Sequence, residues 1–174
     1  MPLTAREQVC YHNARSISDY GDLGHAEVVG MRIPQSKFGA MADEYFKLFD
    51  EKGRRPDQNG DRGTEYRNLV GLPGGKSSPL AKELVAASQR QGDKLDFAVG
   101  KGDDADAVAL AWIYDTQEYP FYIAEAYHQF HDGFRFDESY PQSYNDLASR
   151  KAKAKQFQGT ECPNGMLGIG IAGL

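Results

Sequence analysis

Two carboxylates and a phenol stand in short, glycine-bounded motifs of this 174-residue chain. Glu27 lies in the run Gly-His-Ala-Glu-Val-Val, and Asp61 and Tyr66 lie in Gly-Asp-Arg-Gly-Thr-Glu-Tyr-Arg. Apolar neighbours favour the neutral form of a carboxyl, so Glu27 could be a general acid near neutral pH. Glycines allow positive φ and close backbone approach, which suits a turn that lines a ligand site. We therefore predict an acid site built from Glu27, Asp61 and Tyr66.

Each of these residues also has an ordinary structural interpretation. Glu27 could be a surface glutamate of a strand, and Tyr66 could be an aromatic at the rim of the core. Asp61 could form an Asx-turn, in which its side chain bonds the backbone two residues on. His128 and His131 have helical spacing for two metal ligands, but no third histidine or cysteine is near them. We therefore expect no metal site and assign these histidines to hydrogen bonds on a helix.

Local sequence patterns predict the elements that would position the acid site. Alternating or β-branched runs predict strands over residues 25–33, 66–72, 95–99 and 108–114. Helical periodicity predicts helices after Ser36, Ser78 and Pro120, with Ser36 and Ser78 as N-caps, and a basic helix over residues 144–156. Because strands and helices alternate, we expect an α/β fold, a sandwich in which helices cover a mixed sheet. One domain should span residues 1–158, followed by an irregular, glycine-rich C-terminal tail over residues 159–174.

Composition and charge argue against several classes of protein. The formal net charge is −5, and 20 lysines and arginines are scattered among 25 acidic residues. No basic stripe suggests a nucleic-acid or anionic membrane partner, and no apolar run of about 18 residues suggests a membrane span. The two cysteines, Cys10 and Cys162, are too few for a disulfide scaffold, so we expect a reducing, cytoplasmic location.

Four sequence runs, in order, resemble one known family. They are GHAEVV, GDRGTEYR, FYIAEAYHQ and GTECPNGMLGIG. Together they are similar to the A-type methionine sulfoxide reductases, the peptide-methionine (S)-S-oxide reductase family, from about Glu7 to the C-terminus. The resemblance implies an α/β fold and an oxidoreductase that returns methionine-S-sulfoxide in proteins to methionine, a protein-repair activity in oxidative stress. It implies no bound cofactor, and thioredoxin or another dithiol as the reductant.

The resemblance also implies a role for each matching residue. In the family a cysteine thiolate attacks the sulfoxide sulfur. Glu27 would donate a proton to the sulfoxide oxygen, with Asp61 as its supporting carboxylate, and Tyr66 would donate a hydrogen bond to the same oxygen. Glu27 and Tyr66 would thus also bind the substrate. Cys162 would be the resolving cysteine, which attacks the sulfenic acid and forms a disulfide that thioredoxin reduces.

The sequence departs from the family pattern at the attacking thiol. The family's nucleophile lies in a Gly-Cys-Phe-Trp motif ahead of the GHAEVV counterpart, and the printed sequence contains no such motif. Cys10 resembles a family cysteine that is not the attacking one. Three hypotheses stay open: a working reductase whose nucleophile is encoded upstream of Met1, a catalytically silent protein that binds oxidised methionine or a partner protein, and a thiol-independent acid catalyst.

Overall fold

The structure is a computed structural model that describes residues 24, 26–58, 60–122, 150–151 and 153–154. The described residues up to Pro120 belong to one compact unit, and those from Phe121 onward belong to a second. Arg150, Lys151 and Lys153, within the predicted basic helix, are helical. Most of the predicted helix after Pro120, the domain boundary at residue 158 and the glycine-rich tail lie outside the described residues and stay predictions.

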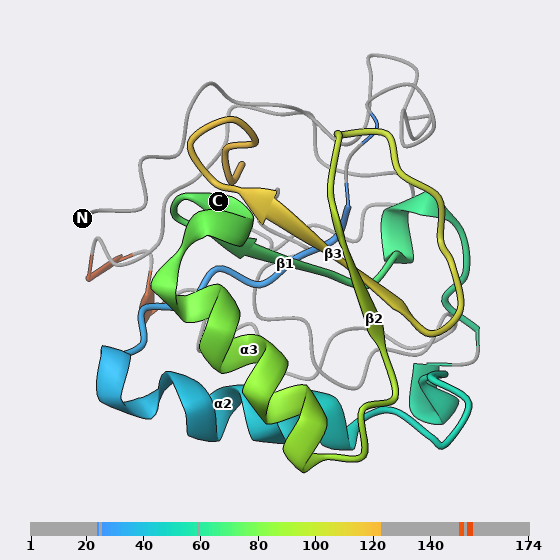
Figure 1. The fold of residues 1–174 in the computed structure, drawn as a ribbon. Helices are drawn as coiled ribbons and strands as arrows, with labels where there is room; N and C mark the ends of the chain where they lie inside the picture. Colours follow the sequence, from blue (N-terminus) through green and yellow to red (C-terminus); the bar gives the residue numbers. More distant parts are fainter. Residues whose placement is uncertain (1–23, 25, 59, 123–149, 152, 155–174) are drawn as a thin grey trace, which may run out of the picture. The chain divides into compact units, whose positions relative to one another are not determined.

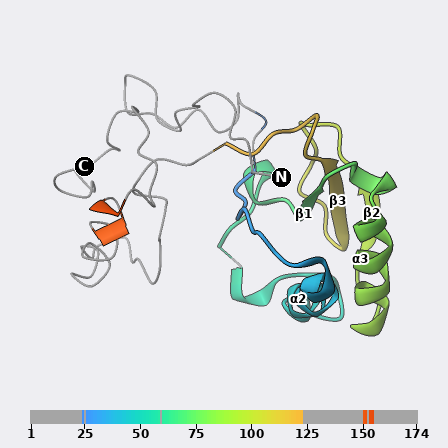
Figure 2. The ribbon, with the colours of Figure 1, turned by 90° about the vertical axis from the view of Figure 1, so that its left-hand side faces the viewer.

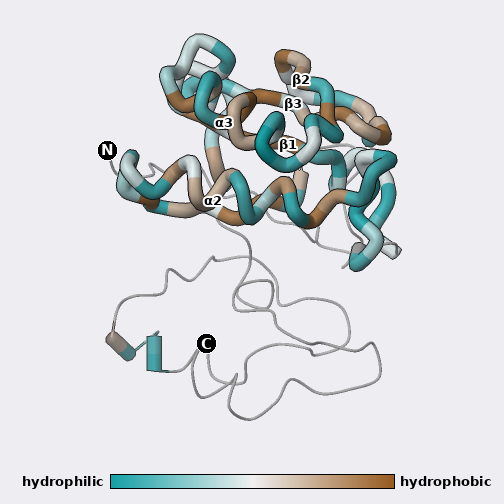
Figure 3. Tube along the Cα trace, turned by 60° about the horizontal axis from the view of Figure 1, so that its bottom comes forward, coloured by the Kyte–Doolittle hydropathy of each residue, from teal (hydrophilic) through white to brown (hydrophobic). Residues whose placement is uncertain are grey.

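Helix α2 spans Gln35–Lys47 and confirms the helix predicted from apolar periodicity. Its buried residues repeat every four positions, which places them on one face of the helix: Phe38, Ala42 and Phe46. Figure 3 shows the resulting alternation of hydrophobic and hydrophilic residues along α2. The predicted N-cap was wrong, because the helix begins before Ser36. Pro34 occupies the N-cap position and no side chain caps the helix.

Helix α3 spans Pro79–Arg90 and begins where the sequence predicts. Ser78 is its N-cap: the serine hydroxyl accepts a hydrogen bond from the Leu80 N–H at 3.3 Å, and Pro79 is the first helical residue. Proline suits this position because its missing N–H would have no intrahelical partner there.

No helix among the described residues is long and apolar enough to cross a membrane.

The described strands form one parallel sheet. They are β1 (Leu69–Leu72), β2 (Asp96–Val99) and β3 (Leu110–Asp115), arranged in the order β1-β3-β2 (Figure 1). Both pairs are parallel, with Gly71 opposite Tyr114 and Phe97 opposite Ala111. The predicted α/β fold is confirmed, although a mixed sheet was expected and the strands described here pair only in parallel.

The predicted strand over residues 25–33 was wrong for the described residues. Ala26 to Ile33 carry no regular secondary structure. Among the described residues, the backbone bond that ties this segment to the rest of the unit runs from the Glu27 N–H to the Glu65 carbonyl. Val28, Val29 and Met31 are exposed, so the β-branched run does not form a buried face. β-branched residues fit a pleated, half-buried surface, and this segment has no such surface.

Both helices pack on the same face of the sheet. Figure 2 shows α2 and α3 on one side of the sheet. The core joins Phe38, Ala42 and Phe46 of α2 and Leu84 of α3 with alternate residues of β3, Ala111 and Ile113. The Phe46 ring meets the edge of the Phe97 ring with centroids 5.9 Å apart. Because side chains alternate across a strand, Tyr114 lies on the other face.

A loop, not a helix, crosses the other face of the sheet. β2 and β3 are parallel neighbours joined by residues 100–109, none of which is helical, whereas such crossovers usually carry a helix. The loop runs close over Tyr114: a Cβ added to Gly100 would lie 2.4 Å from the tyrosine ring. This loop covers Tyr114 and brings a buried carboxylate, Asp104, onto that face.

Candidate functional site

A backbone hydrogen bond joins the two segments from which the acid site was predicted. The Glu27 N–H donates to the carbonyl oxygen of Glu65 at 2.8 Å. Glu65 lies in a short 3-10 turn, Thr64–Tyr66, so Tyr66 belongs to this turn and not to the start of a strand as predicted. This bond therefore brings Glu27 and Tyr66 close together, although they are far apart in the sequence.

The Glu27 carboxyl has two acidic neighbours, Asp61 and Glu65. Partial burial of the carboxyl, followed by the negative charges of Asp61 and Glu65, raises the pKa of Glu27. The residue as a whole is still exposed to solvent. A carboxyl that is both partly desolvated and surrounded by like charge keeps its proton to higher pH, which is the state a proton donor needs.

Burial and nearby negative charges also shift the pKa of Tyr66. Burial raises the pKa of Tyr66 first, and the negative charges of Glu27, Asp61 and Glu65 add to the effect. The phenol therefore stays neutral and able to donate a hydrogen bond throughout the physiological range. The three predicted residues thus lie within electrostatic range of one another in the structure.

Gly63 shapes the turn that carries the acid site. Its φ is +113°, and a Cβ there would lie 3.1 Å from a carboxylate oxygen of Glu65. Its N–H donates to the carboxylate of Asp106 at 3.2 Å. In an Asx-turn at Asp61, the Asp61 side chain would accept a hydrogen bond from this same N–H. In the structure, the carboxylate that accepts it belongs to Asp106.

Glu65 is a member of the cluster that the sequence analysis missed. Its carbonyl accepts from Glu27, its carboxylate contributes to the raised pKa values of Glu27 and Tyr66, and its side chain accepts a hydrogen bond from the Thr64 hydroxyl at 3.4 Å. Its place directly before Tyr66 in the motif was the available signal. A turn, unlike a strand, does not send adjacent side chains to opposite faces, so this signal required knowing the backbone conformation.

Arg67, directly after this turn, is a buried cation that the sequence analysis also missed. It is only 5 % exposed. Its Nη1 donates to the Thr64 carbonyl at 2.6 Å, and its Nη2 donates to the carbonyls of Gly24 at 3.0 Å and Gly102 at 2.7 Å. Its Nε donates to the Tyr114 hydroxyl at 3.1 Å. One guanidinium therefore joins three parts of the chain. They are the start of the segment at residues 24–33, hereafter the Glu27 segment, the 3-10 turn Thr64–Tyr66, hereafter the acid turn, and the loop that crosses the sheet.

Asp104 supplies a negative charge close to this guanidinium. The Tyr114 hydroxyl donates a short hydrogen bond to its carboxylate, and the N–H groups of Lys101 and Gly102 donate to the same oxygen. Burial acts to raise the pKa of Asp104, but these hydrogen bonds and the Arg67 charge outweigh it and hold the pKa below its usual range. Burial and the Asp104 partner raise the pKa of Tyr114 to about 12. The charges are thus paired in a network rather than left isolated in the fold.

Among the residues that the structure describes, no group of three or more histidines, cysteines or acidic residues is arranged to hold a metal ion. The histidine pair at 128 and 131 lies outside the described residues, and so do Cys10 and Cys162. The roles of both cysteines therefore stay predictions.

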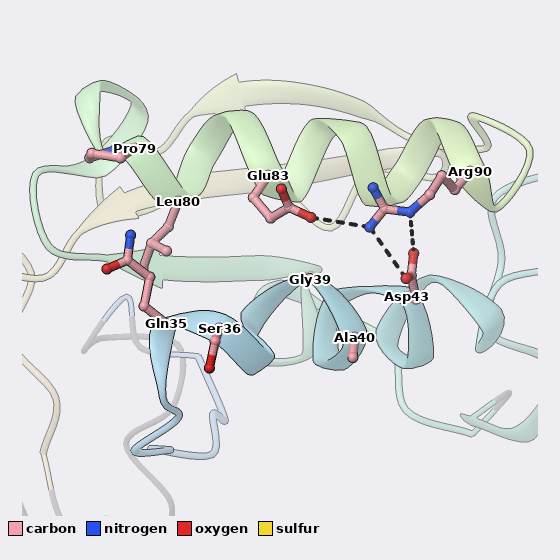
Figure 4. A pocket seen from close by; sticks show the side chains of 9 residues that line it. All are labelled: Gln35, Ser36, Gly39, Ala40, Asp43, Pro79, Leu80, Glu83 and Arg90. Atoms are coloured by element: carbon pink, nitrogen blue, oxygen red, sulfur yellow. Dashed lines mark hydrogen bonds and ion pairs between the residues drawn. The ribbon is translucent and has the colours of Figure 1, made fainter.

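A separate groove lies between the two helices. It has a volume of about 520 Å³ and is lined by residues of α2 and α3 (Figure 4). Arg90 spans it, bonded to Asp43 at 3.1 Å and to Glu83 at 3.2 Å. None of the predicted site residues lines this groove, and its charged side chains are paired with each other.

Comparison with models of known families, with curated proteins and with solved structures finds no match for this chain. What the molecule does must therefore be inferred from the chemistry of the Glu27, Asp61, Glu65 and Tyr66 cluster, hereafter the acid cluster, and from the sequence motifs that carry it.

Proposed function

We propose that this protein binds methionine-S-sulfoxide in oxidised proteins and donates a proton to the sulfoxide oxygen, as the A-type methionine sulfoxide reductases that its motifs resemble. The observation that carries the proposal is the backbone bond from Glu27 to Glu65, which brings a carboxyl with a raised pKa beside Tyr66. The resemblance of the four motifs supports the same assignment, in which these two residues would contact the sulfoxide oxygen.

The acid cluster fits the chemistry of a sulfoxide. A sulfoxide oxygen carries partial negative charge and accepts hydrogen bonds, so two neutral donors, a protonated Glu27 and the Tyr66 phenol, are matched to it. Proton donation becomes more valuable as the S–O bond breaks, because the oxygen then develops further negative charge. Asp61 and Glu65 contribute by raising the pKa of Glu27.

Reduction of the sulfoxide also needs two thiols. In the proposed reaction a thiolate attacks the sulfoxide sulfur, the oxygen passes to that thiol as a sulfenic acid, and methionine is released. Cys162 then attacks the sulfenic sulfur, water leaves, and a disulfide forms. A dithiol such as thioredoxin reduces this disulfide, so the overall change is sulfoxide plus two thiols to sulfide, disulfide and water. A reducing compartment such as the cytoplasm suits this chemistry.

A binding experiment tests the recognition half of the proposal. The full chain is titrated with three matched peptides that contain methionine-S-sulfoxide, methionine-R-sulfoxide or methionine, and the dissociation constants are measured by calorimetry at pH 6. The S-sulfoxide should bind tightest. Glu27→Ala and Tyr66→Phe each remove one donor to the sulfoxide oxygen, so each should weaken binding of the S-sulfoxide peptide about 10-fold, the equivalent of about 1.4 kcal/mol. Equal affinity for all three peptides would contradict the proposal.

A turnover experiment separates the open hypotheses about the thiol. The full chain is incubated with dithiothreitol and the S-sulfoxide peptide, alongside Cys10→Ser and Cys162→Ser. Turnover that one of these substitutions abolishes identifies a thiol of this chain as the nucleophile. Binding without turnover leaves the catalytically silent protein and the reductase whose nucleophile lies outside these 174 residues. Turnover that survives both substitutions favours acid catalysis that uses no thiol of this chain, with dithiothreitol as the reductant.

A further inference from the structure

We infer that Arg67 is a positioning residue for Glu27: its guanidinium holds the start of the Glu27 segment against the turn that carries Tyr66. The inference rests on the proposed function in one respect only, namely that Glu27 is the proton donor. It concerns how the fold sets the distance between the two groups that would contact the sulfoxide oxygen.

At least two ties connect the described part of the Glu27 segment to the acid turn, and Arg67 supplies one of them. The first tie is the backbone bond from Glu27 to Glu65. The second runs through the guanidinium, which bonds the Gly24 carbonyl with Nη2 and the Thr64 carbonyl with Nη1. A segment held at a single point can pivot about that point. Held at two points, the backbone around Glu27 keeps one orientation relative to Tyr66.

The guanidinium is itself held by Tyr114 and by the Gly102 carbonyl. Nε donates to the Tyr114 hydroxyl and Nη2 to the Gly102 carbonyl, while the ring of Tyr114 lies 5.6 Å from the guanidinium carbon. All three nitrogens are engaged, and the planar fork can satisfy these acceptors in one orientation only. Tyr114 belongs to the central strand β3, so the guanidinium anchors the Glu27 segment to the strand that is paired on both sides.

Lysine cannot replace this arrangement. Its ammonium keeps the positive charge but is a compact point donor without the fork geometry, so it cannot reach the carbonyls of Gly24, Thr64 and Gly102 together. Arg67→Lys therefore removes the clamp while it leaves the charge near Asp104 in place. Freed from the second tie, the Glu27 carboxyl gains water and moves away from Asp61 and Glu65, the groups that raise its pKa together with burial.

The test follows the titration of Glu27 directly. Side-chain carboxyl resonances of the full chain are recorded by carbon-13 NMR from pH 3 to 9, and the Glu27 signal is assigned by its loss in Glu27→Gln. In Arg67→Lys the pKa of Glu27 should fall toward the ordinary glutamate value. This readout needs no sulfoxide, so it remains decisive even if the peptides fail to bind. Conversely, the binding experiment can fail while the clamp is present.

Two further variants separate positioning from simple loss of stability. Ile113→Val removes a methylene from the helix-covered face of the sheet and should lower the free energy of unfolding without moving the Glu27 titration. Tyr114→Phe removes one acceptor of the guanidinium and should lower the pKa of Glu27 by less than Arg67→Lys does.

The inference is overturned if Arg67→Lys folds and Glu27 still titrates as in the unsubstituted chain. If Arg67→Lys does not fold, Tyr114→Phe decides the matter, and a folded variant with an unchanged Glu27 titration overturns the inference. A shift of equal size in Ile113→Val would likewise show that Glu27 senses general loosening of the fold and not the clamp.

Discussion

The raised pKa of Glu27 makes ionisation of this residue unfavourable to folding. Its carboxylate is harder to form in the folded chain than in the unfolded chain, because burial and the charges of Asp61 and Glu65 raise its pKa. Below the ordinary glutamate pKa both states are protonated, and this residue has no net effect on stability. As pH rises through the window between the ordinary and the raised pKa, the unfolded state loses its proton first and stability falls.

Glu27→Gln should therefore be more stable than the unsubstituted chain at neutral pH and lose this advantage at low pH. The amide keeps the shape of the side chain and cannot ionise, so the stability lost above the titration window is regained. Urea unfolding followed by circular dichroism at several pH values from 3.5 to 8 measures the effect. Glu118→Gln, at an exposed position outside the acid cluster, is the matched control. The same pH-dependent gain in both variants would rule out a special environment at Glu27.

At the scale of residues, the sequence predicted the members of the site better than their supports. Glu27, Asp61 and Tyr66 were predicted from short motifs, and the structure brings them within electrostatic range. Arg67 was missed although it ends one of those motifs, because three of its acceptors are backbone carbonyls, which every residue carries. Which carbonyls a buried arginine meets depends on the fold, and nothing in the local sequence records it.

Helix α3 shows how an element can be defined by one local signal. Ser78 caps it, its hydroxyl bonding the Leu80 N–H, whereas α2 begins without a side-chain cap. The groups at a helix start that lack intrahelical partners must be satisfied by a cap or by water. The start of α3 packs beside the sheet, since Ser78 is buried, so the cap is the partner that matters there.

Ser78→Ala should lower the unfolding free energy by about 0.5–2 kcal/mol, because a buried N–H loses its acceptor. The neighbouring Ser77→Ala is a matched control, since Ser77 is exposed and lies before the cap position. Thermal unfolding of both variants at one pH gives the difference. If the two substitutions lower stability equally, the cap assignment is wrong.

At the scale of elements, prediction succeeded where the signal is local and failed where a partner decides. Both helices and the strands β1, β2 and β3 were predicted within a few residues, because periodicity, caps and turn residues stand in the sequence itself. The strand over residues 25–33 was wrong because a strand exists only with a neighbour to bond, and the described residues supply that segment with one backbone bond. The parallel pairing was likewise a property of the crossovers and could not be obtained from any single strand.

For the molecule as a whole, β3 is the centre of the described unit. It pairs with β1 on one side and β2 on the other, carries core residues on one face and bears Tyr114 on the other. Opening it requires breaking two ladders and both layers at once, so local fluctuations should not expose its amides.

Native-state hydrogen exchange followed by NMR should therefore show the β3 amides among the slowest in the unit. The Trp112 amide, which donates to the Asn68 carbonyl at 2.9 Å, should exchange only through global unfolding. Amides of the edge strand β2 should exchange faster, through partial opening. Protection of β2 equal to or greater than that of β3 would contradict this picture of the unit.

The bonds of Arg67 reach Gly24, Gly102 and Tyr114, which are 43, 35 and 47 positions away in the chain. Contacts of such separation form late, since closing long loops is entropically costly before other contacts reward it. A chain in which this network has not formed lacks the Arg67 hydrogen bonds that join Gly24 to the turn at Thr64. The raised pKa of Glu27 is therefore expected only in chains in which these long-range bonds have formed.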